Sequence, residues 1–358
     1  MNDRVDDTAR RRILGAGACA LLLGAPHARA EFMDWPQASA HSHGFDPAAL
    51  DGVLEDAGAV PRMRAIAVAR HGHLVAQRYY GGAVAGQPLR INSCTKSVVA
   101  LLVGQALSQG KLRDLSQPVG DLLPEAAARV PDSVASHVTL RQILTGTSGI
   151  EYDYQRDLGA LSGAADPVDH VLRLPRSEQA AGRWSYNDAA ISLLTPILER
   201  AYGEELRQVA QRDLAAPMAV SGVRWASDRT GRATAAAGLQ LRVLDLLKIA
   251  WLMIDQGRWR GSQVVPAAWI AECLQPHAPG AWPLPPIEGS SYGYLWFTGS
   301  LRGRRVAWAW GFGGQFAFLV PSLRLAVATA AAEPPMPELV RQTRDVMALV
   351  ARVADAAA

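Results

Sequence analysis

The sequence predicts an α+β fold in which strands near both ends of the chain bracket a mostly helical middle. Apolar and polar residues alternate over residues 63–81 and again over 291–332, as in half-buried strands. Between these regions, apolar residues recur at helical spacing. The 358 residues are 49% hydrophobic and 19% charged, which is typical of a globular protein. We find no internal repeat, and the length fits one large domain or two modest ones.

The charge pattern narrows the choice of partners. The net charge is only +3, and no block of basic residues occurs outside the extreme N-terminus. Nucleic acid and anionic membranes are therefore not expected as partners. Lysine occurs only as Lys96, Lys111 and Lys248, so a motif that contains a lysine is more informative here than in most chains.

The first thirty residues have the pattern of an export signal. Consecutive arginines in Ala9–Leu14 precede the apolar run Ile13–Ala25, and Ala28-Arg29-Ala30 then provides a small-x-small cleavage site. The apolar run is too short to span a bilayer. We expect residues 1–30 to be a twin-arginine-like signal peptide, which would make the mature protein periplasmic or secreted, without stable membrane insertion. A basic N-terminus followed by a small apolar helix remains the alternative.

The cysteines do not predict a disulfide. Cys19 would leave with the signal, so that Cys94 and Cys273 remain in the mature chain. Cys94 lies beside a candidate nucleophile on a helix that we expect to be buried. A structural disulfide is therefore not expected, although an exported protein would be in a compartment that permits one.

The N-terminal part of the mature chain reads as a helix followed by a hairpin. Asp46 is suited to cap a helix that has Pro47 at its first position. The strand-like runs 63–70 and 74–81 are joined by His71-Gly72-His73, a turn typical of a β-hairpin. These histidines, like His41 and His43, have no Cys, Asp or Glu cluster to complete a metal site, so we predict no bound metal.

The remaining elements follow from periodicity and from Gly and Pro signals. The helical pattern that begins at Ser93 runs to about residue 115, with Gly110 as its stop signal. Further helices are expected over 138–146, 188–215 with interruptions at Pro196 and Gly203, 239–257, 266–276 and 337–354. Strands are expected over 291–298, 304–310, 316–321 and 325–331.

The segment SCTK contains a candidate nucleophile and its base. Ser93 and Lys96 are three residues apart, so on a helix their side chains lie on one face. Serine needs a neighbouring base to attack a carbonyl, and a desolvated lysine can serve as one. The free backbone N–H groups at the helix N-terminus can stabilise an oxyanion. Taken alone, the segment favours the plainer interpretation, an ordinary helix start with one exposed lysine.

Two further segments support chemistry at this serine. In GRWSYND, Tyr186 follows a turn and precedes a helix, so it could transfer a proton if it lies near a lysine; a packing tyrosine is the alternative. In WGFGGQF, Gly313 and Gly314 follow a strand and permit close approach of another backbone or of a substrate, although a plain β-turn has the same composition. The sequence contains neither a GxSxG elbow nor an HExxH motif.

In this order and spacing, INSCTKS, VTLRQILTGTSGI, GRWSYND, residues 238–270 and WGFGGQF resemble segments of the serine β-lactamase and penicillin-recognising family. The similarity is to its β-lactamase-related branch, which includes carboxylesterases and 6-aminohexanoate-oligomer hydrolases. The resemblance implies a β-lactamase/transpeptidase-like fold, with an antiparallel sheet flanked by helices and a mostly helical subdomain. Residues 31–358 would form a single catalytic domain. Its α/β part would span about 45–92 and 236–356, and its helical part about 93–235.

The resemblance also implies roles for individual residues. Ser93 would be the acylated nucleophile, and Lys96 and Tyr186 would form the proton-transfer pair. The backbone N–H groups of Ser93 and of Gln315, which follows Phe312-Gly313-Gly314, would form the oxyanion hole.

Two positions depart from the family pattern. Asp188 stands where the Tyr-x-Asn motif has asparagine, which puts the usual contact to a substrate amide in doubt. Phe312 replaces a cationic or imidazole residue, which removes a partner for a substrate carboxylate. Tyr152 and Tyr154 could line an acyl pocket or lie at the surface.

These departures argue against potent β-lactamase or D-alanyl-D-alanine carboxypeptidase activity. We expect an exported serine hydrolase that cleaves small esters or amides through an acyl-enzyme, without metal or organic cofactor. One alternative is a penicillin-recognising DD-peptidase or weak β-lactamase. Another is a catalytically silent relative that binds peptidoglycan or a partner protein. The sequence does not indicate an oligomeric state.

Overall fold

The computed structural model describes residues 35–180, 182–220 and 223–357. The expected signal peptide, residues 1–30, lies outside the described residues. These described residues form one compact unit. It combines an antiparallel sheet with flanking helices, which confirms the predicted α+β class. The division into an α/β part and a helical part stays a prediction.

Strands from both ends of the chain form the main sheet. Its first strand, β1, pairs with its last strand, β13, so that Ala67 lies opposite Ala328. Glycine-containing turns join most of the other neighbours as hairpins. In the described residues the sheet has eight strands, in the order β2 (His73–Tyr79), β1 (Met63–Arg70), β13 (Leu325–Ala331), β12 (Gln315–Val320), β11 (Arg304–Gly311), β10 (Phe297–Leu301), β9 (Glu288–Tyr292) and β8 (Ala278–Pro279).

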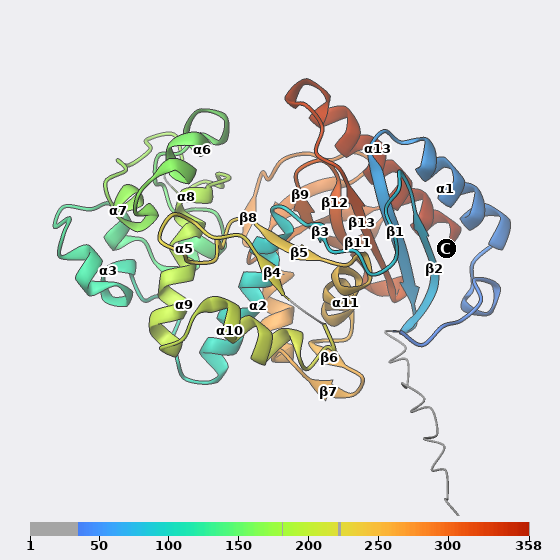
Figure 1. The fold of residues 1–358 in the computed structure, drawn as a ribbon, viewed down its shortest axis with the longest axis horizontal. Helices are drawn as coiled ribbons and strands as arrows, with labels where there is room; N and C mark the ends of the chain where they lie inside the picture. The colour runs from blue at the N-terminus through green and yellow to red at the C-terminus, as the bar shows by residue number, and fades with distance from the viewer. Residues whose placement is uncertain (1–34, 181, 221–222, 358) are drawn as a thin grey trace, which may run out of the picture. The chain divides into compact units, whose positions relative to one another are not determined.

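Helices cover both faces of this sheet (Figure 1). On one face α1 (Pro47–Ala59) packs beside the long C-terminal helix α13 (Met336–Ala356), and on the other α11 (Val243–Ile254) lies across β1, β12 and β13. Asp46 caps α1 as expected, because its carboxylate accepts hydrogen bonds from the backbone N–H groups of the first turn. None of the helices described here combines the length and the apolar character needed to cross a membrane.

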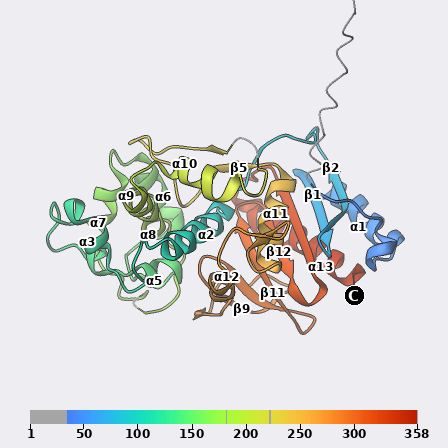
Figure 2. The same cartoon turned by 90° about the horizontal axis from the view of Figure 1, so that it is seen from below.

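The remaining helices gather to one side of the sheet, and α2 (Cys94–Ser108) lies between these helices and the sheet (Figure 2). The helix expected over 188–215 is divided at Gly203 as predicted, but its first break lies at Leu193, and Pro196 instead belongs to the first turn of the helix that follows this break. The helical region ends in a π-helical turn, Gln211–Ala215. This group contains α3 (Val119–Leu122), α4 (Pro124–Ala127), α5 (Leu140–Leu144), α6 (Tyr154–Gly163), α7 (Pro167–Leu172), α8 (Asp188–Ser192), α9 (Leu194–Tyr202) and α10 (Leu206–Ala210), whereas α12 (Ala267–Cys273) packs against α2.

Three other sequence-based boundaries were wrong. The strand expected over 291–298 is broken by a turn between β9 and β10, in which the N–H of Gly293 donates to the carbonyl oxygen of Trp296 and Leu295 has a left-handed backbone. The helix expected from residue 239 begins at Val243, because Leu239–Leu241 is strand β5 instead. The helix that begins after Ser93 ends at Ser108 rather than near residue 115.

A small second sheet positions the start of α2. Strand β5 pairs with both β3 (Leu89–Arg90) and β4 (Arg224–Trp225). The pairing continues beyond β3, where the N–H of Ile91 donates to the carbonyl oxygen of Leu239. The segment that precedes β5 is thereby brought beside the first turn of α2.

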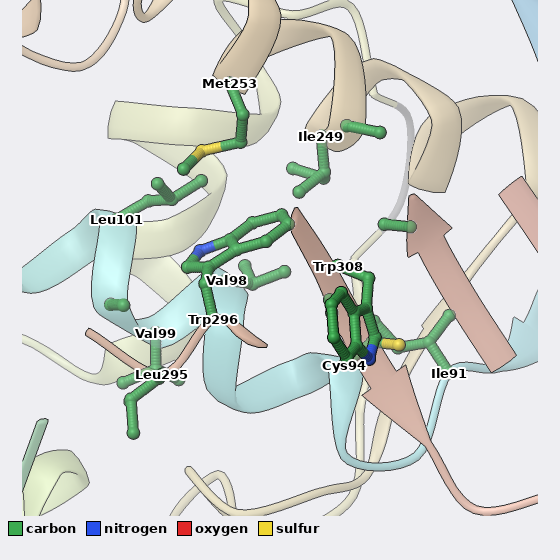
Figure 3. Packing of buried hydrophobic residues seen from close by; sticks show 14 of the residues in the cluster. Ile91, Cys94, Val98, Val99, Leu101, Ile249, Met253, Leu295, Trp296 and Trp308 are labelled. Atoms are coloured by element: carbon green, nitrogen blue, oxygen red, sulfur yellow. The ribbon is translucent and has the colours of Figure 1, made fainter. Parts of the chain in front are cut away.

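Helix α2 is the central helix of the molecule, because almost all of its residues are buried. Figure 3 shows the indole of Trp296 among Val98 and Leu101 of α2 and Ile249 and Met253 of α11. On another face, the indole N–H of Trp269 donates to a carbonyl oxygen of α2 over 2.9 Å. This dense packing fixes α2 from several sides, so its first turn is a rigid support for side chains.

Candidate active site

Ser93 occupies the N-cap position of α2, but its side chain caps nothing. A serine at this position usually accepts a hydrogen bond from the first turn. Here the hydroxyl oxygen instead accepts a hydrogen bond from Nζ of Lys96 at 2.8 Å, and Ser93 lines a cavity. The preceding residue, Asn92, has a left-handed backbone with φ of 47°, which turns the chain into the helix. The hydroxyl is therefore available for chemistry.

Lys96 is only 2% exposed and has three polar contacts. Besides Ser93, its ammonium group donates to the carbonyl oxygen of Ala236 at 2.6 Å and lies 2.8 Å from Oδ1 of Asp188. The ammonium group also lies 4.8 Å from the ring centre of Tyr186. Three partners match the three N–H donors of a lysine, so the arrangement holds the group in one position. The residues in contact around Lys96 come from three separate segments of the chain, 93–96, 186–188 and 236.

Asp188 partners Lys96 and is not one of the residues that line the cavity. Its carboxylate is 4% exposed, and the contact is an ion pair rather than a well-directed hydrogen bond. The neighbouring Asn187 caps α8 through its side-chain oxygen and donates to the carbonyl oxygen of Ile150. The departure from the Tyr-x-Asn pattern therefore places a negative charge on the lysine rather than an amide in the substrate site.

Tyr186 lies in the same cluster and also lines the cavity. Burial raises the pKa of its hydroxyl well above the usual value, and the nearby charge of Asp188 raises it further, whereas a hydrogen bond with Ser93 acts in the opposite direction. The raised pKa keeps Tyr186 as a neutral phenol in the resting protein. This state suits the acid half of the acid/base role that we expected for it.

The glycine turn between β11 and β12 is tied to the residue before Ser93. The side-chain amide of Asn92 donates to the carbonyl oxygen of Phe312 at 3.0 Å. Gly313 and Gly314 face α13, because Cβ atoms added there would meet Pro334 and Val346 at 2.9 and 2.8 Å. Their smallness therefore serves the close approach of α13, and neither glycine lines the cavity, whereas Phe312 does.

Gln315 anchors the base of this turn. Its side chain is fully buried, donates to the carbonyl oxygen of Ala331 at 2.6 Å and accepts from the N–H of the same residue at 3.0 Å. Its predicted backbone contact to an oxyanion stays a prediction. The backbone N–H of Ser93 fits the other half of that site, since it has no acceptor among the residues that the structure describes.

The cavity above Ser93 has a volume of about 650 Å³, and aromatic side chains are the largest group among its lining residues. The tyrosines that we expected either here or at the surface, Tyr152 and Tyr154, both line it. Tyr152 is buried, and its hydroxyl has no hydrogen-bond partner among the described residues. The other lining residues are Asp153, Gln155, Trp184, Ser185, Tyr186, Trp282, Pro283, Leu284, Phe297, Trp310, Phe312, Met336, Leu339, Val340, Thr343 and Arg344.

Sequence reasoning missed two walls of this cavity. Trp282 belongs to the loop between β8 and β9, and the first turns of α13 contribute Met336, Val340 and Arg344. None of these residues belongs to a motif. The only sequence feature that pointed to an aromatic cavity was the presence of Trp184 and Trp310 within GRWSYND and WGFGGQF.

A second hollow, of about 430 Å³, lies among α4, α7 and α9 and contains no candidate nucleophile among its lining residues. Its arginines are already paired: Arg200 with Glu125 at 2.7 Å, and Arg232 with Glu199 at 3.1 Å. Within the described residues, no group of His, Cys, Asp and Glu has the arrangement of a metal site. The chemistry-bearing residues therefore meet at Ser93.

Comparison with known proteins identifies the family. The family model for beta-lactamase matches residues 51–352. Among characterised proteins, esterase EstB of Burkholderia gladioli is 33% identical over 48% of this chain and 49% of its own length. The 6-aminohexanoate-dimer hydrolase of Paenarthrobacter ureafaciens is 26% identical over 67% of this chain and 65% of its own length. These alignments span between half and two thirds of the relatives' lengths.

Solved structures show the same fold at lower identity. The octameric penicillin-binding protein homologue from Pyrococcus abyssi superposes with a TM-score of 0.64 over 85% of this chain and 77% of its own, at 19% identity. This superposition confirms the β-lactamase/transpeptidase-like fold. The names of the two sequence relatives support the prediction of an enzyme of the serine hydrolase class. Since the family model covers most of the sequence, the chain belongs to the beta-lactamase family.

Proposed function

We propose that this protein is a serine hydrolase that cleaves esters or amides through an acyl-enzyme on Ser93. One observation carries the proposal: the Ser93 hydroxyl is not used as a helix cap, accepts a hydrogen bond from buried Lys96, and lies at an aromatic cavity. An uncapped serine with a fixed lysine at 2.8 Å is the arrangement that nucleophilic catalysis needs.

In the proposed acylation step, the Ser93 oxygen attacks the substrate carbonyl carbon. Lys96 gives a proton to Asp188, 2.8 Å away, and the amine so formed accepts the proton of Ser93. The N–H of Ser93, at the N-terminus of α2, stabilises the oxyanion. Tyr186 donates its phenolic proton to the leaving group, and the resulting phenolate is stabilised by the Lys96 ammonium.

Deacylation reverses these proton transfers with water. The Tyr186 phenolate takes a proton from water, whose oxygen attacks the acyl carbon. When the acyl–oxygen bond breaks, Ser93 recovers a proton from Lys96, and Lys96 recovers one from Asp188. The residues return to their starting protonation states, so the proposed cycle consumes only substrate and water.

The residues around the nucleophile favour uncharged esters or amides over penicillins. Phe312 lies at the cavity where the family pattern has a cation or imidazole, so a substrate carboxylate finds no partner at that position. The names of the relatives, an esterase and a 6-aminohexanoate-dimer hydrolase, agree with ester or amide cleavage. We also propose that the protein is exported, on the basis of the signal pattern in residues 1–30.

Intact-mass measurement tests the acyl-enzyme directly. The protein and its Ser93→Ala variant are incubated separately with a fluorophosphonate, p-nitrophenyl acetate and a penicillin. We expect a mass increase with the first two reagents, only in the protein that retains Ser93, and slow or absent labelling by penicillin. Rapid stoichiometric penicillin labelling would favour a DD-peptidase or weak β-lactamase. Failure of all three reagents would leave a catalytically silent binding protein.

A further inference from the structure

We propose that the preferred substrates carry a bulky, uncharged apolar group, which lies on a shelf formed by Trp282, Met336 and Val340. This inference rests on the proposed hydrolase function and adds the class of substrate. The shelf belongs to the same cavity as Ser93, so a group lying on it can be part of the molecule whose carbonyl reaches the nucleophile.

The shelf concentrates the exposed apolar surface of the protein. Trp282, Met336 and Val340 are 42%, 47% and 59% exposed, and among the large apolar side chains of the described residues only Val84 is comparable. Three such residues from two distant segments line one cavity mouth. A concentration of exposed apolar side chains at a cavity is typical of a binding surface, whereas scattered ones are ordinary.

Trp282 is held rigidly although much of it is exposed. Its ring stacks on Tyr186 with a centroid distance of 4.6 Å and makes edge contacts with Trp184 at 5.5 Å and Trp310 at 5.9 Å. A ring fixed on three sides loses little conformational entropy when a ligand covers its free face. The shelf is therefore ready to receive an apolar group before substrate arrives.

The charges at the cavity do not favour a strongly charged substrate. Asp153 and Arg344, which have opposite signs, are the only formally charged side chains among the lining residues. The carboxylate of Asp153 already accepts hydrogen bonds from the backbone N–H groups of Gln155 and Arg156. Because Arg344 could instead bind a negatively charged substrate group, the test includes an ester that ends in a carboxylate.

Two ester series test how the shelf affects kcat/KM. In one, p-nitrophenyl esters run from acetate to octanoate, which varies the acyl group; in the other, alkyl acetates run from methyl to octyl, which varies the alcohol. Full burial of a methylene corresponds to about a fourfold gain, and we expect about twofold per methylene on a half-open shelf. The octanoate-to-acetate ratio of kcat/KM, or the matching octyl-to-ethyl ratio, should therefore reach about 50.

Substitutions at the shelf locate the effect. In the double variant Met336→Gln/Val340→Gln, the same ratio should fall below about fivefold, because the shelf becomes polar. Val84→Gln is the matched control: it changes an equally exposed valine that does not line the cavity, and it should keep the wild-type ratio.

The outcomes separate this inference from the proposed function. Chain-length dependence in either series that disappears in the double variant supports the shelf. Flat behaviour in both series, dependence that persists in the double variant, or preference for a carboxylate-ended ester of equal length overturns it. If p-nitrophenyl acetate is cleaved equally by the protein and by Ser93→Ala, the proposed function fails as well.

Discussion

Two buried lysine–aspartate pairs in this molecule have similar geometry and different surroundings. Lys96 lies 2.8 Å from Asp188, and Lys248 lies 3.1 Å from Asp245. Lys96 also donates to the backbone carbonyl of Ala236, and Lys248 to that of Ala219. At an effective dielectric constant of 20, the gross attraction in either pair is about 5–6 kcal/mol, so pair strength does not distinguish them.

The remaining contacts do distinguish them. Asp245 also binds the guanidinium of Arg242 at 2.6 and 2.7 Å, and the ammonium of Lys248 lies 5.6 Å from the ring centre of Trp259. By contrast, the remaining hydrogen bond of Lys96 goes to a hydroxyl at a cavity. Burial and pairing alone therefore do not identify a catalytic lysine; its contact with a reactive group at an open cavity does.

The largest expected effect separates the two lysines by activity. Lys96→Met should lower kcat/KM for p-nitrophenyl acetate by about 10³ or more, because Ser93 loses its proton acceptor. Lys248→Met should stay within about threefold of wild type per folded molecule. Steady-state kinetics with the folded fraction measured by circular dichroism checks both values. An equal loss in the two variants would remove the distinction.

The Lys248–Asp245 pair should matter for stability rather than for activity. Asp245→Asn leaves Lys248, which is fully buried, without its carboxylate and should lower the free energy of unfolding by about 3 kcal/mol or more. Urea unfolding followed by fluorescence measures this change. The activity of the molecules that remain folded should be unchanged. A loss below about 1 kcal/mol would mean that Arg242 and the backbone contacts suffice to stabilise the cluster.

A pH titration sharpens the role of the active-site aspartate. Because the pKa of Tyr186 is raised well above its ordinary value of 10.0, its phenol should remain protonated as the pH rises through 10. Asp188→Asn removes a negative charge that raises this pKa, so the alkaline limb of kcat/KM should move to lower pH. Absorbance of tyrosinate at alkaline pH, with Tyr186→Phe as the blank, reports the same shift. An unmoved limb would contradict the coupling.

The third lysine provides the smallest effect. Lys111 is exposed, and its ammonium lies 5.9 Å from the ring centre of Tyr202. Lys111→Met should leave kcat/KM unchanged and the Tm within about 2 °C of wild type, since exposed contacts of this kind contribute little. Differential scanning fluorimetry is sufficient for the comparison. A larger shift would show that exposure underestimates the contribution of this lysine.

Much of the fold and the centre of the site could be predicted because local patterns mark the helices and strands and because the motifs resemble those of a known family. Helix α1 begins at the capping residue that the sequence indicated, and Ser93, Lys96 and Tyr186 meet as the motifs implied. The break after β9 was missed because the apolar residues 294–297 continue the strand pattern through a turn in which Leu295 has a left-handed backbone. Strand β5 was predicted as helix because its apolar residues continue the pattern of the helix that follows. It forms a strand because it pairs with β3 and β4.

The rest of the site was missed because no local pattern encodes it. The carbonyl of Ala236 reaches Lys96 only through the small sheet, and a backbone oxygen carries no residue-type signal. Trp282 and the residues of α13 reach the cavity through tertiary packing alone. Asp188 was noticed as a departure from a motif, but its partner became evident only from the distance to Lys96.

The place of α13 in the chain has a consequence for biosynthesis. Ser93 is synthesised well before α13, which supplies one wall of its cavity, and before β13, the strand that pairs with β1. A nascent chain emerging from the ribosome therefore has its nucleophile long before it can enclose a substrate. Such distant pairing slows folding, so the ability to select a substrate should be acquired late.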